Sequence, residues 1–236
     1  MFFRRDLSRH MTGVHAAIMG MGGWFDAEDL SGPFKTFRAI DEFNPGAVNS
    51  IVVGPWSHGG WTRGDGDRLG DVTFDQKTGA FFRAQILFPF FEHYLKGHNA
   101  DPLPNAYVFE TGTNTWRKYD AWPPKNASPK TLYFHAGGKL SFDSPVERIA
   151  SDEYISDPAH PVPYVNYPAI SVLQRYMTDD QRFASERPDV LTYETDPLTE
   201  NVTIVGPVRP MLKVASTGTD SDFVMQLIDV YQCLSR

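Results

Sequence analysis

The sequence predicts an α/β fold in its first part and an all-β sandwich in its second. Two short apolar runs, 14–21 and 51–54, flank an amphipathic stretch that has its own start and stop residues. After residue 100, short β-rich runs alternate with Pro, Gly, Asn and Asp. We therefore expect residues 1–100 to form a parallel sheet with helices and residues 101–236 to form the sandwich.

Composition excludes several classes of function. The net charge is -7, and no basic stripe appears, so nucleic acid is not expected as a partner. No apolar segment reaches the roughly 18 residues that a membrane span needs, so no membrane partner is expected. One cysteine excludes an internal disulfide framework and a multi-cysteine metal site. We expect no metal, and the family resemblance described below implies no cofactor.

The first strand and helix follow from the residues between Val14 and Asn44. The run Val14–Met21 is short, apolar and bounded by glycine, as is typical of a strand buried on both faces. Ser31 is a candidate N-cap, and Pro33 suits a first helical turn. Apolar residues then recur at three-residue spacing as far as Phe43, which predicts an amphipathic helix.

A second buried strand over 51–54 completes a strand–helix–strand unit, which favours a parallel sheet. A longer helix is expected over 81–97, because apolar residues four apart give it one buried face. Pro89 should kink this helix, and Gly97 should end it.

The second part is predicted to contain short strands joined by loops. Partial alternation of apolar and polar residues supports this interpretation. The expected strands are Ala106–Phe109, Thr131–His135, Leu191–Glu194, Asn201–Val205, Met211–Ser216 and Phe223–Tyr231.

Polar residues follow both strands of the predicted parallel sheet. Three carboxylates, Asp26, Glu28 and Asp29, come just after the first strand, and His58 comes just after the second. In a hydrolytic triad, an acid orients the imidazole of a histidine and stabilises its cation. The order acid then histidine is that of the α/β-hydrolases. The alternative is that Asp26 caps the following helix and His58 is an ordinary turn residue.

Several segments resemble one family. GGWFDAEDL (22–30), GPWSHGGW (54–61) and PFFEHYLKG (89–97) resemble the CocE/NonD hydrolases, also called the X-prolyl dipeptidyl-peptidase S15 family. The likeness is greatest to its α-amino acid ester hydrolase and glutaryl-7-aminocephalosporanate acylase branch, and it extends to residues 176–207 and 216–231. The resemblance implies the C-terminal half of an α/β-hydrolase catalytic domain followed by a jelly-roll-like sandwich, incomplete at both ends.

The resemblance also implies roles for individual residues. Asp26 would be the triad acid and His58 the triad base. Glu28 and Asp29 would bind the α-ammonium group of the substrate, although both acids also suit the N-terminus of a helix. Three aromatic residues near the pair would line an acyl pocket or pack in the core. They are Trp24, Trp56 and Trp61.

The family's nucleophile motif is missing from this sequence. No G-x-S-x-G is present, and Ser57 stands beside His58 in the chain, where the two side chains would diverge. We therefore expect a fragment that is inactive alone and prone to aggregate through an open sheet edge. Arg4, Arg5 and Asp6 would be the exit of a preceding cap segment.

The resemblance implies a serine hydrolase of esters or amides, with α-amino acyl groups (including β-lactam side chains) as substrates. An X-prolyl dipeptidyl-peptidase or a cocaine-esterase-like activity is the alternative within the enzymes. A non-catalytic β-sandwich binding module is the alternative outside them. The expected partner is a small-molecule ester or amide, with homo-oligomers of the full-length enzyme. A periplasmic or extracellular location is favoured by resemblance alone.

Overall fold

The computed structural model describes residues 6–99, 101–146, 150–171 and 173–231. Arg4 and Arg5, predicted to belong to the exit of a cap segment, lie outside these described residues. Its main element is a four-stranded sheet with the strand order β1-β2-β5-β6. The first three strands are parallel, and β6 is antiparallel to β5. The strands are β1 (Ile18–Gly23), β2 (Asn49–Gly54), β5 (Ala106–Glu110) and β6 (Thr115–Tyr119).

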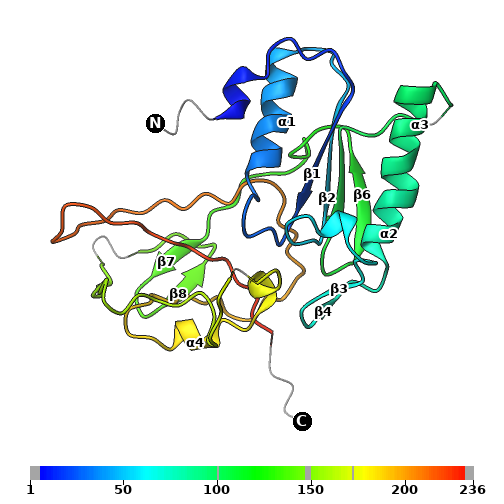
Figure 1. The fold of residues 1–236 in the computed structure, drawn as a ribbon. Helices are drawn as coiled ribbons and strands as arrows, with labels where there is room; N and C mark the ends of the chain where they lie inside the picture. The colour runs from blue at the N-terminus through cyan, green and yellow to red at the C-terminus, as the bar shows by residue number, and fades with distance from the viewer. Residues whose placement is uncertain (1–5, 100, 147–149, 172, 232–236) are drawn as a thin grey trace.

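Helices cover both faces of this sheet (Figure 1). The helix α1 (Gly32–Phe43) lies on one face. The other face is covered by α2 (Thr78–Phe82), the π-helical turn η4 (Arg83–Leu87) and α3 (Phe88–Lys96). The predicted parallel sheet with helices is therefore confirmed for the strands β1 and β2.

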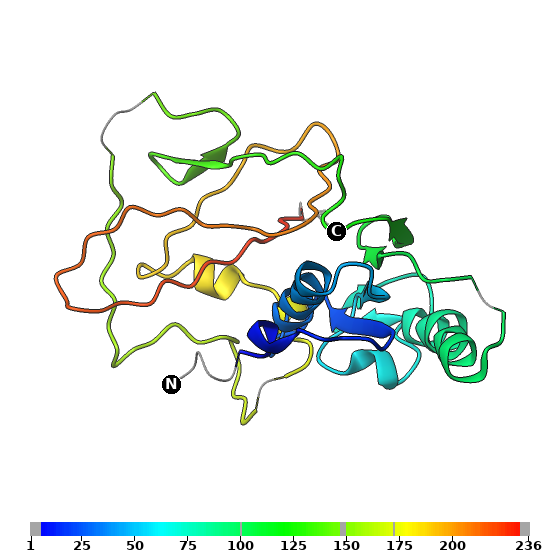
Figure 2. The same cartoon turned by 90° about the horizontal axis from the view of Figure 1, so that it is seen from above.

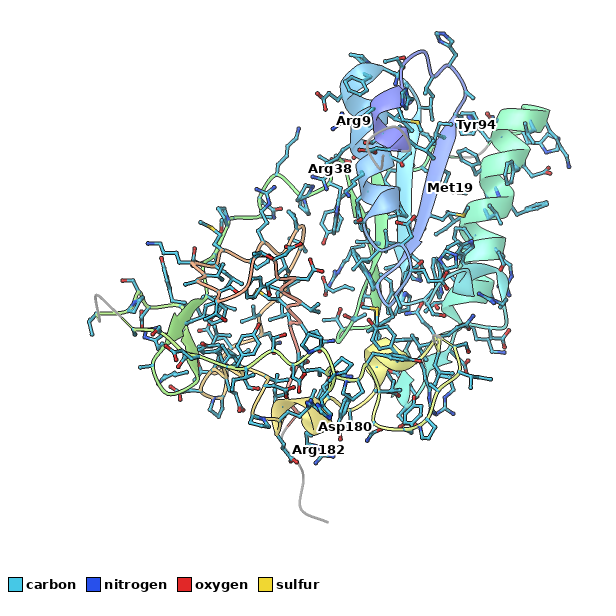
Figure 3. All side chains as sticks on the ribbon, turned by 60° about the vertical axis from the view of Figure 1, so that its left-hand side comes forward. Arg9, Met19, Arg38, Tyr94, Asp180 and Arg182 are labelled. Carbon is cyan, nitrogen blue, oxygen red and sulfur yellow. The ribbon has the colours of Figure 1, made fainter. Side chains whose placement is uncertain are left out.

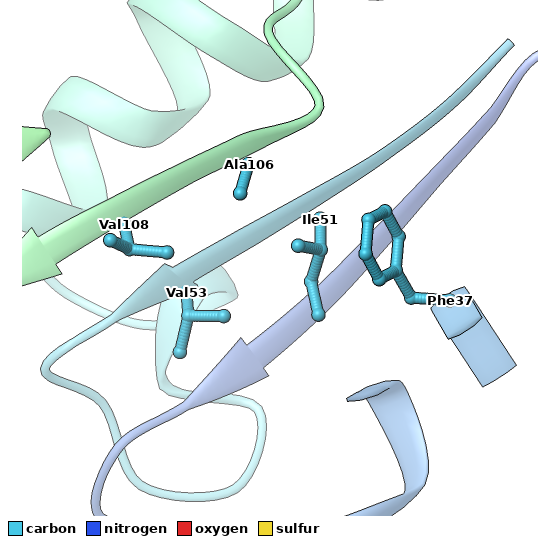
Figure 4. Packing of buried hydrophobic residues seen from close by; sticks show 5 residues of the cluster. All are labelled: Phe37, Ile51, Val53, Ala106 and Val108. Atoms are coloured by element: carbon cyan, nitrogen blue, oxygen red, sulfur yellow. The ribbon is translucent and has the colours of Figure 1, made fainter. Parts of the chain in front are cut away.

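The strand β2 is buried along its whole length. Ile51 and Val53 pack with Phe37 of α1 on one face, as Figure 4 shows. Val52 points to the other face and packs with Phe82 and Ile86. A continuous apolar strand between two helical layers is the pattern of a central parallel strand.

Helix α1 begins differently from the prediction. Ser31 makes no side-chain capping bond and lies in the helical region of φ and ψ. Instead, the carboxylate of Asp29 accepts the N–H of Gly32 at 2.8 Å. Asp29 reaches this orphan donor from one turn earlier in the chain, so the capping role predicted for Ser31 belongs to Asp29.

The long helix ends as predicted, and the turn before its proline is π-helical instead of α-helical. Pro89 has no N–H to offer the carbonyl of Gln85, and the turn before it, η4, is π-helical. At the other end, Gly97 has φ 70°, and its N–H bonds to the carbonyl of His93 at 3.0 Å. This left-handed glycine confirms the predicted helix end at Lys96.

The first sheet continues past residue 100. The expected sandwich strand Ala106–Phe109 is instead β5, which pairs in parallel with β2, and β6 extends the same sheet. Ala106 and Val108 are buried against Phe37 and the strand β2, which explains the pairing. Assigning this strand to the sandwich was wrong, and the proposed division into two domains stays a prediction.

The remaining elements of the described chain are short. They are η2 (Leu7–His10), η3 (Gly60–Thr62), β3 (Arg68–Leu69), β4 (Val72–Thr73), β7 (Tyr133–His135), β8 (Lys139–Ser141), η5 (Tyr176–Thr178) and α4 (Arg182–Ser185).

Residues 120–146, 150–171 and 173–231, which we call the extended region, contain little regular structure (Figure 2). The strand β7 falls in the predicted run 131–135 and pairs with β8, and Glu194 forms a single bridge to Lys139. Within the described residues, the runs predicted at 201–205, 211–216 and 223–231 are extended chain without assigned strands. Their apolar side chains are largely exposed, so no covering layer stabilises a ladder.

Short-range polar contacts are frequent in the extended region. The Arg182 Nε donates to Asp180 Oδ2 at 2.7 Å (Figure 3). This bond, helped by the N–H of Arg182, lowers the pKa of Asp180 to about 2. Because both side chains are exposed, the pair adds little to the free energy of unfolding.

Candidate active site

Asp26 and His58 meet at one edge of the sheet. Asp26 follows the end of β1, and His58 follows the end of β2, so both leave the carboxyl ends of neighbouring parallel strands. The His58 Nδ1 lies 3.0 Å from Asp26 Oδ2 and 3.2 Å from Asp26 Oδ1. In open α/β sheets this edge is where ligands bind. The structure therefore brings together the two residues for which catalytic roles were predicted.

Main-chain contacts beyond the strands fix the two loops against each other. The N–H of Trp24 bonds to the carbonyl of Gly54 at 2.9 Å, and the N–H of Phe25 bonds to the carbonyl of Trp56 at 3.1 Å. Gly23 lies so close to this chain that a Cβ would come 2.1 Å from the Trp56 carbonyl oxygen. Glycine at position 23 therefore allows the approach that places Asp26 beside His58.

The carboxylate of Asp26 is held in its charged form. Its side chain is only 2% exposed. Burial acts to raise its pKa, but the N–H groups of Asp29 and Glu28, each 2.9 Å from Oδ1, and the bond to His58 outweigh burial. The net result is a lowered pKa, as expected for a carboxylate that accepts several hydrogen bonds.

The imidazole of His58 is placed to exchange protons with a ligand. Its hydrogen bond to Asp26, and then the charge of Asp26, raise its pKa. The side chain is 48% exposed, whereas that of Asp26 is buried. With Nδ1 directed at Asp26, Nε2 is the nitrogen that can accept a proton from a nucleophile and return it to a leaving group.

Glu28 and Asp29 have different surroundings. Both are exposed and add negative charge that raises the pKa of His58. One carboxylate oxygen of Asp29 is occupied by the N–H of Gly32, in the helix-terminus role that the sequence left open. Glu28 has its carboxylate at the surface beside the pair.

The three tryptophans occupy two kinds of position. Trp24 stacks on Phe34, and its Nε1 donates to the carbonyl of Phe109 at 2.7 Å. Trp56 is 3% exposed and belongs to the core cluster of Val52. Both rings therefore pack against neighbouring side chains, and their predicted place in an acyl pocket stays a prediction.

Trp61 is the tryptophan that faces the candidate base. Its ring contacts the imidazole of His58 edge-on, with 6.5 Å between centroids. It is partly buried against the core cluster of Val52. Ser57, in contrast, is 5% exposed, which agrees with its dismissal as a nucleophile.

Sequence reasoning missed Thr78 and Arg83. Thr78 is fully buried, accepts the Nε1–H of Trp56 at 2.9 Å and donates to the carbonyl of Gly66. Arg83 donates to the carbonyls of Trp61 and Gly64 at 3.0 and 2.8 Å. Both side chains brace the loop after His58. A polar residue at the start of an otherwise apolar helix was the one signal for Thr78.

Within the described ranges, no group of three or more His, Cys, Asp or Glu side chains could hold a metal ion. In the same part of the chain, no helix is long and apolar enough to cross a membrane.

Comparisons with known proteins agree with the family resemblance. The cocaine esterase of Rhodococcus sp. (strain MB1 Bresler) is 28% identical over 240 residues, which are 96% of this chain and 40% of the esterase. An aminopeptidase structure from the marine sediment archaeon Thaumarchaeota archaeon superposes with a TM-score of 0.75 and 39% identity. It covers 83% of this chain and 33% of its own.

A second solved structure is an α-amino acid ester hydrolase, with a TM-score of 0.74 and 38% identity over 82% of this chain and 34% of that chain. This chain thus spans a third to two fifths of the length of these proteins. Residues 89–233 match the family model of the X-Pro dipeptidyl-peptidase C-terminal non-catalytic domain. The chain therefore belongs to the CocE/NonD hydrolases of the X-Pro dipeptidyl-peptidase family.

Proposed function

We propose that this chain supplies the acid and the base of a serine hydrolase that cleaves esters or amides of α-amino acyl groups. The observation that carries the proposal is the 3.0 Å contact between His58 Nδ1 and Asp26 at the carboxyl ends of adjacent parallel strands. His58 takes the proton of a serine and then gives it to the leaving group. Asp26 holds the imidazole in the required tautomer and stabilises its cation.

The α-amino specificity rests on Glu28. Its carboxylate lies at the surface beside the catalytic pair, where it can meet a substrate ammonium. The two structural neighbours described above are an aminopeptidase and an α-amino acid ester hydrolase, and both exceed the cocaine esterase in identity to this chain. Asp29 acts mainly through its charge, because one of its oxygens caps α1.

Trp61 is the proposed wall of the acyl pocket. It is the predicted tryptophan whose ring meets His58. The extended region is proposed to belong to a jelly-roll-like sandwich in the complete enzyme. Cocaine-esterase-like hydrolysis is the second candidate, because that esterase matches 96% of this chain.

The nucleophile must come from outside the described residues. We therefore expect the 236-residue chain alone to show no saturable esterase activity. The direct test is a chimera in which this whole chain replaces the matching segment of the α-amino acid ester hydrolase. The chimera should hydrolyse α-amino acid esters, and Asp26→Asn should lower kcat by about 10⁴-fold, the loss seen when a triad acid is neutralised.

Glu28→Gln in the same chimera tests the specificity. We expect KM for an α-amino ester to rise roughly tenfold, with little change for the desamino ester. A tenfold effect corresponds to about 1.4 kcal/mol, which lies between the ~1 and ~4 kcal/mol of an ion contact in water and near a protein surface. An equal rise for both esters would refute the ammonium site.

A further inference from the structure

The turn that carries His58 is held by an arginine. Gly59 has φ 68°, and a Cβ there would lie 2.8 Å from the Arg63 Nη2. Glycine therefore leaves room for the guanidinium to fold back against the main chain. From this position, Arg63 Nη2 donates a hydrogen bond to the carbonyl oxygen of His58 itself.

The extended region reaches the same loop at two points. With its amide oxygen turned toward Arg63, Gln174 accepts from Nη1 and Nη2 at 3.0 Å each, the orientation that satisfies both groups. Four residues later, the hydroxyl of Thr178, which is 2.8 Å from the carbonyl oxygen of Arg175, also lies 3.3 Å from the carbonyl oxygen of Leu69. In both contacts, a residue of the extended region meets the loop that follows His58, more than 100 positions earlier in the chain.

A residue packed on the sheet holds the same part of this loop. Arg83, which projects from the π-helical turn η4, donates to the carbonyls of Trp61 and Gly64 at 3.0 and 2.8 Å. Arg63 lies between these two carbonyls in the chain. Arg83 therefore holds the main chain on both sides of Arg63. The contact with Gln174 restricts the rotation of the Arg63 guanidinium away from His58.

We propose, on the basis of the function proposed above, that Arg63 is a positioning residue for His58 and that Gln174 holds Arg63 in place. Gln174 lies within the segment matched by the family's non-catalytic domain. That domain would then help to orient the catalytic base through its main-chain carbonyl. A shift of the His58 main chain would turn Nδ1 away from Asp26 and weaken the 3.0 Å bond.

Positioning and simple electrostatics predict opposite results for Arg63. Removing a nearby positive charge, by itself, raises the pKa of a histidine. Weakening the bond between His58 and Asp26 lowers that pKa, because this bond is the main cause of the raised value. Gln174→Ala separates the two effects further, because it changes no charge.

The experiment is an NMR titration of the histidine rings in the intact chain, with His58 assigned by its loss in His58→Gln. In the wild type we expect the Nδ1–H tautomer and a raised pKa. Arg63→Met and Gln174→Ala should each mix the tautomers and lower the pKa of His58. Matched controls are Arg38→Met, on the outside of α1 (Figure 3), and Gln181→Ala, whose amide donates to the nearby main-chain carbonyl of Asp179.

An unchanged His58 tautomer in Gln174→Ala would overturn the role of the extended region. A raised pKa of His58 in Arg63→Met would show that Arg63 acts on His58 only through its charge, and would overturn its positioning role. The readout is independent of turnover. If the wild-type tautomer is as expected but the chimera is inactive, the proposed function fails and the positioning role stands. If wild-type His58 lacks the Nδ1–H bond, the catalytic pair itself is wrong.

Discussion

The sheet and the extended region contain similar β-forming residues but bury them to very different extents. Ile51 in β2 is 0% exposed between two helical layers, whereas Ile204 in the extended region is 58% exposed. Both stand in runs rich in β-forming residues. The difference shows that a β-forming run becomes a strand when another layer covers it, because strand preference mostly reports packing on neighbours.

The two regions also contribute differently to the candidate active site. The buried sheet fixes where the loops of Asp26 and His58 begin, and main-chain bonds between the loops fix where they meet. The extended region touches the site from one side, through Gln174 and Thr178. A rigid base with a braced loop is a suitable way to hold an acid and a base in register.

The largest expected difference between the two regions comes from a pair of glycine substitutions. Gly23→Ala would place a Cβ 2.1 Å from the carbonyl oxygen of Trp56, so the β1 and β2 loops must separate. We expect a loss of about 4 kcal/mol or more in the free energy of unfolding. Gly218→Ala meets its nearest atom at 3.5 Å and should change stability by less than about 0.5 kcal/mol. Urea unfolding followed by tryptophan fluorescence measures both, and equal midpoints would contradict the contrast.

A pair of isoleucine truncations sharpens the same comparison. Ile51→Ala removes a fully buried side chain, and we expect a loss of about 2–5 kcal/mol. Ile204→Ala removes an exposed one and should stay within about 0.5 kcal/mol. The same urea titration serves. A loss above 2 kcal/mol for Ile204→Ala would mean that the extended region is packed in solution.

The smallest expected effect is the pH dependence of stability that comes from the pair Asp26 and His58 of the sheet region. The pKa of His58 is raised above its ordinary 6.5, so its pairing with Asp26 stabilises fully below 6.5 and is lost as pH rises through the folded pKa. The pKa of Asp26 is lowered below 3.8, so its contribution is present above 3.8 and is lost as pH falls through the folded pKa.

His58→Gln should therefore remove the decline in stability at neutral and higher pH while keeping most of the decline in acid. Stability measured against pH in both chains checks this. If His58→Gln kept the full decline in stability at neutral and higher pH, that decline would come from another group, and the assignment to His58 would be wrong.

The sequence predicted what depends on nearby residues. Both strands of the strand–helix–strand unit, the helix α1 and the end at Gly97 follow from local pattern, and they are present. The meeting of Asp26 and His58 also followed, because ends of adjacent parallel strands share an edge.

What depends on distant residues was not predictable. The choice of partner for β5 depends on Phe37 and β2, far away in the chain. One local detail was also missed: the N–H of Gly32 is accepted by Asp29, three residues earlier, and not by Ser31. The Arg63 and Gln174 contact joins residues that no local pattern connects.

The most direct test of the catalytic pair is the titration of His58 in the wild-type chain and in Asp26→Asn. Asn keeps the size of the side chain and removes its charge, so it isolates the bond that raises the pKa of His58. We predict a raised pKa and the Nδ1–H tautomer in the wild type, with both lost in the variant. The same pKa and tautomer in both chains would show that Asp26 does not orient His58, and would contradict the proposed active site.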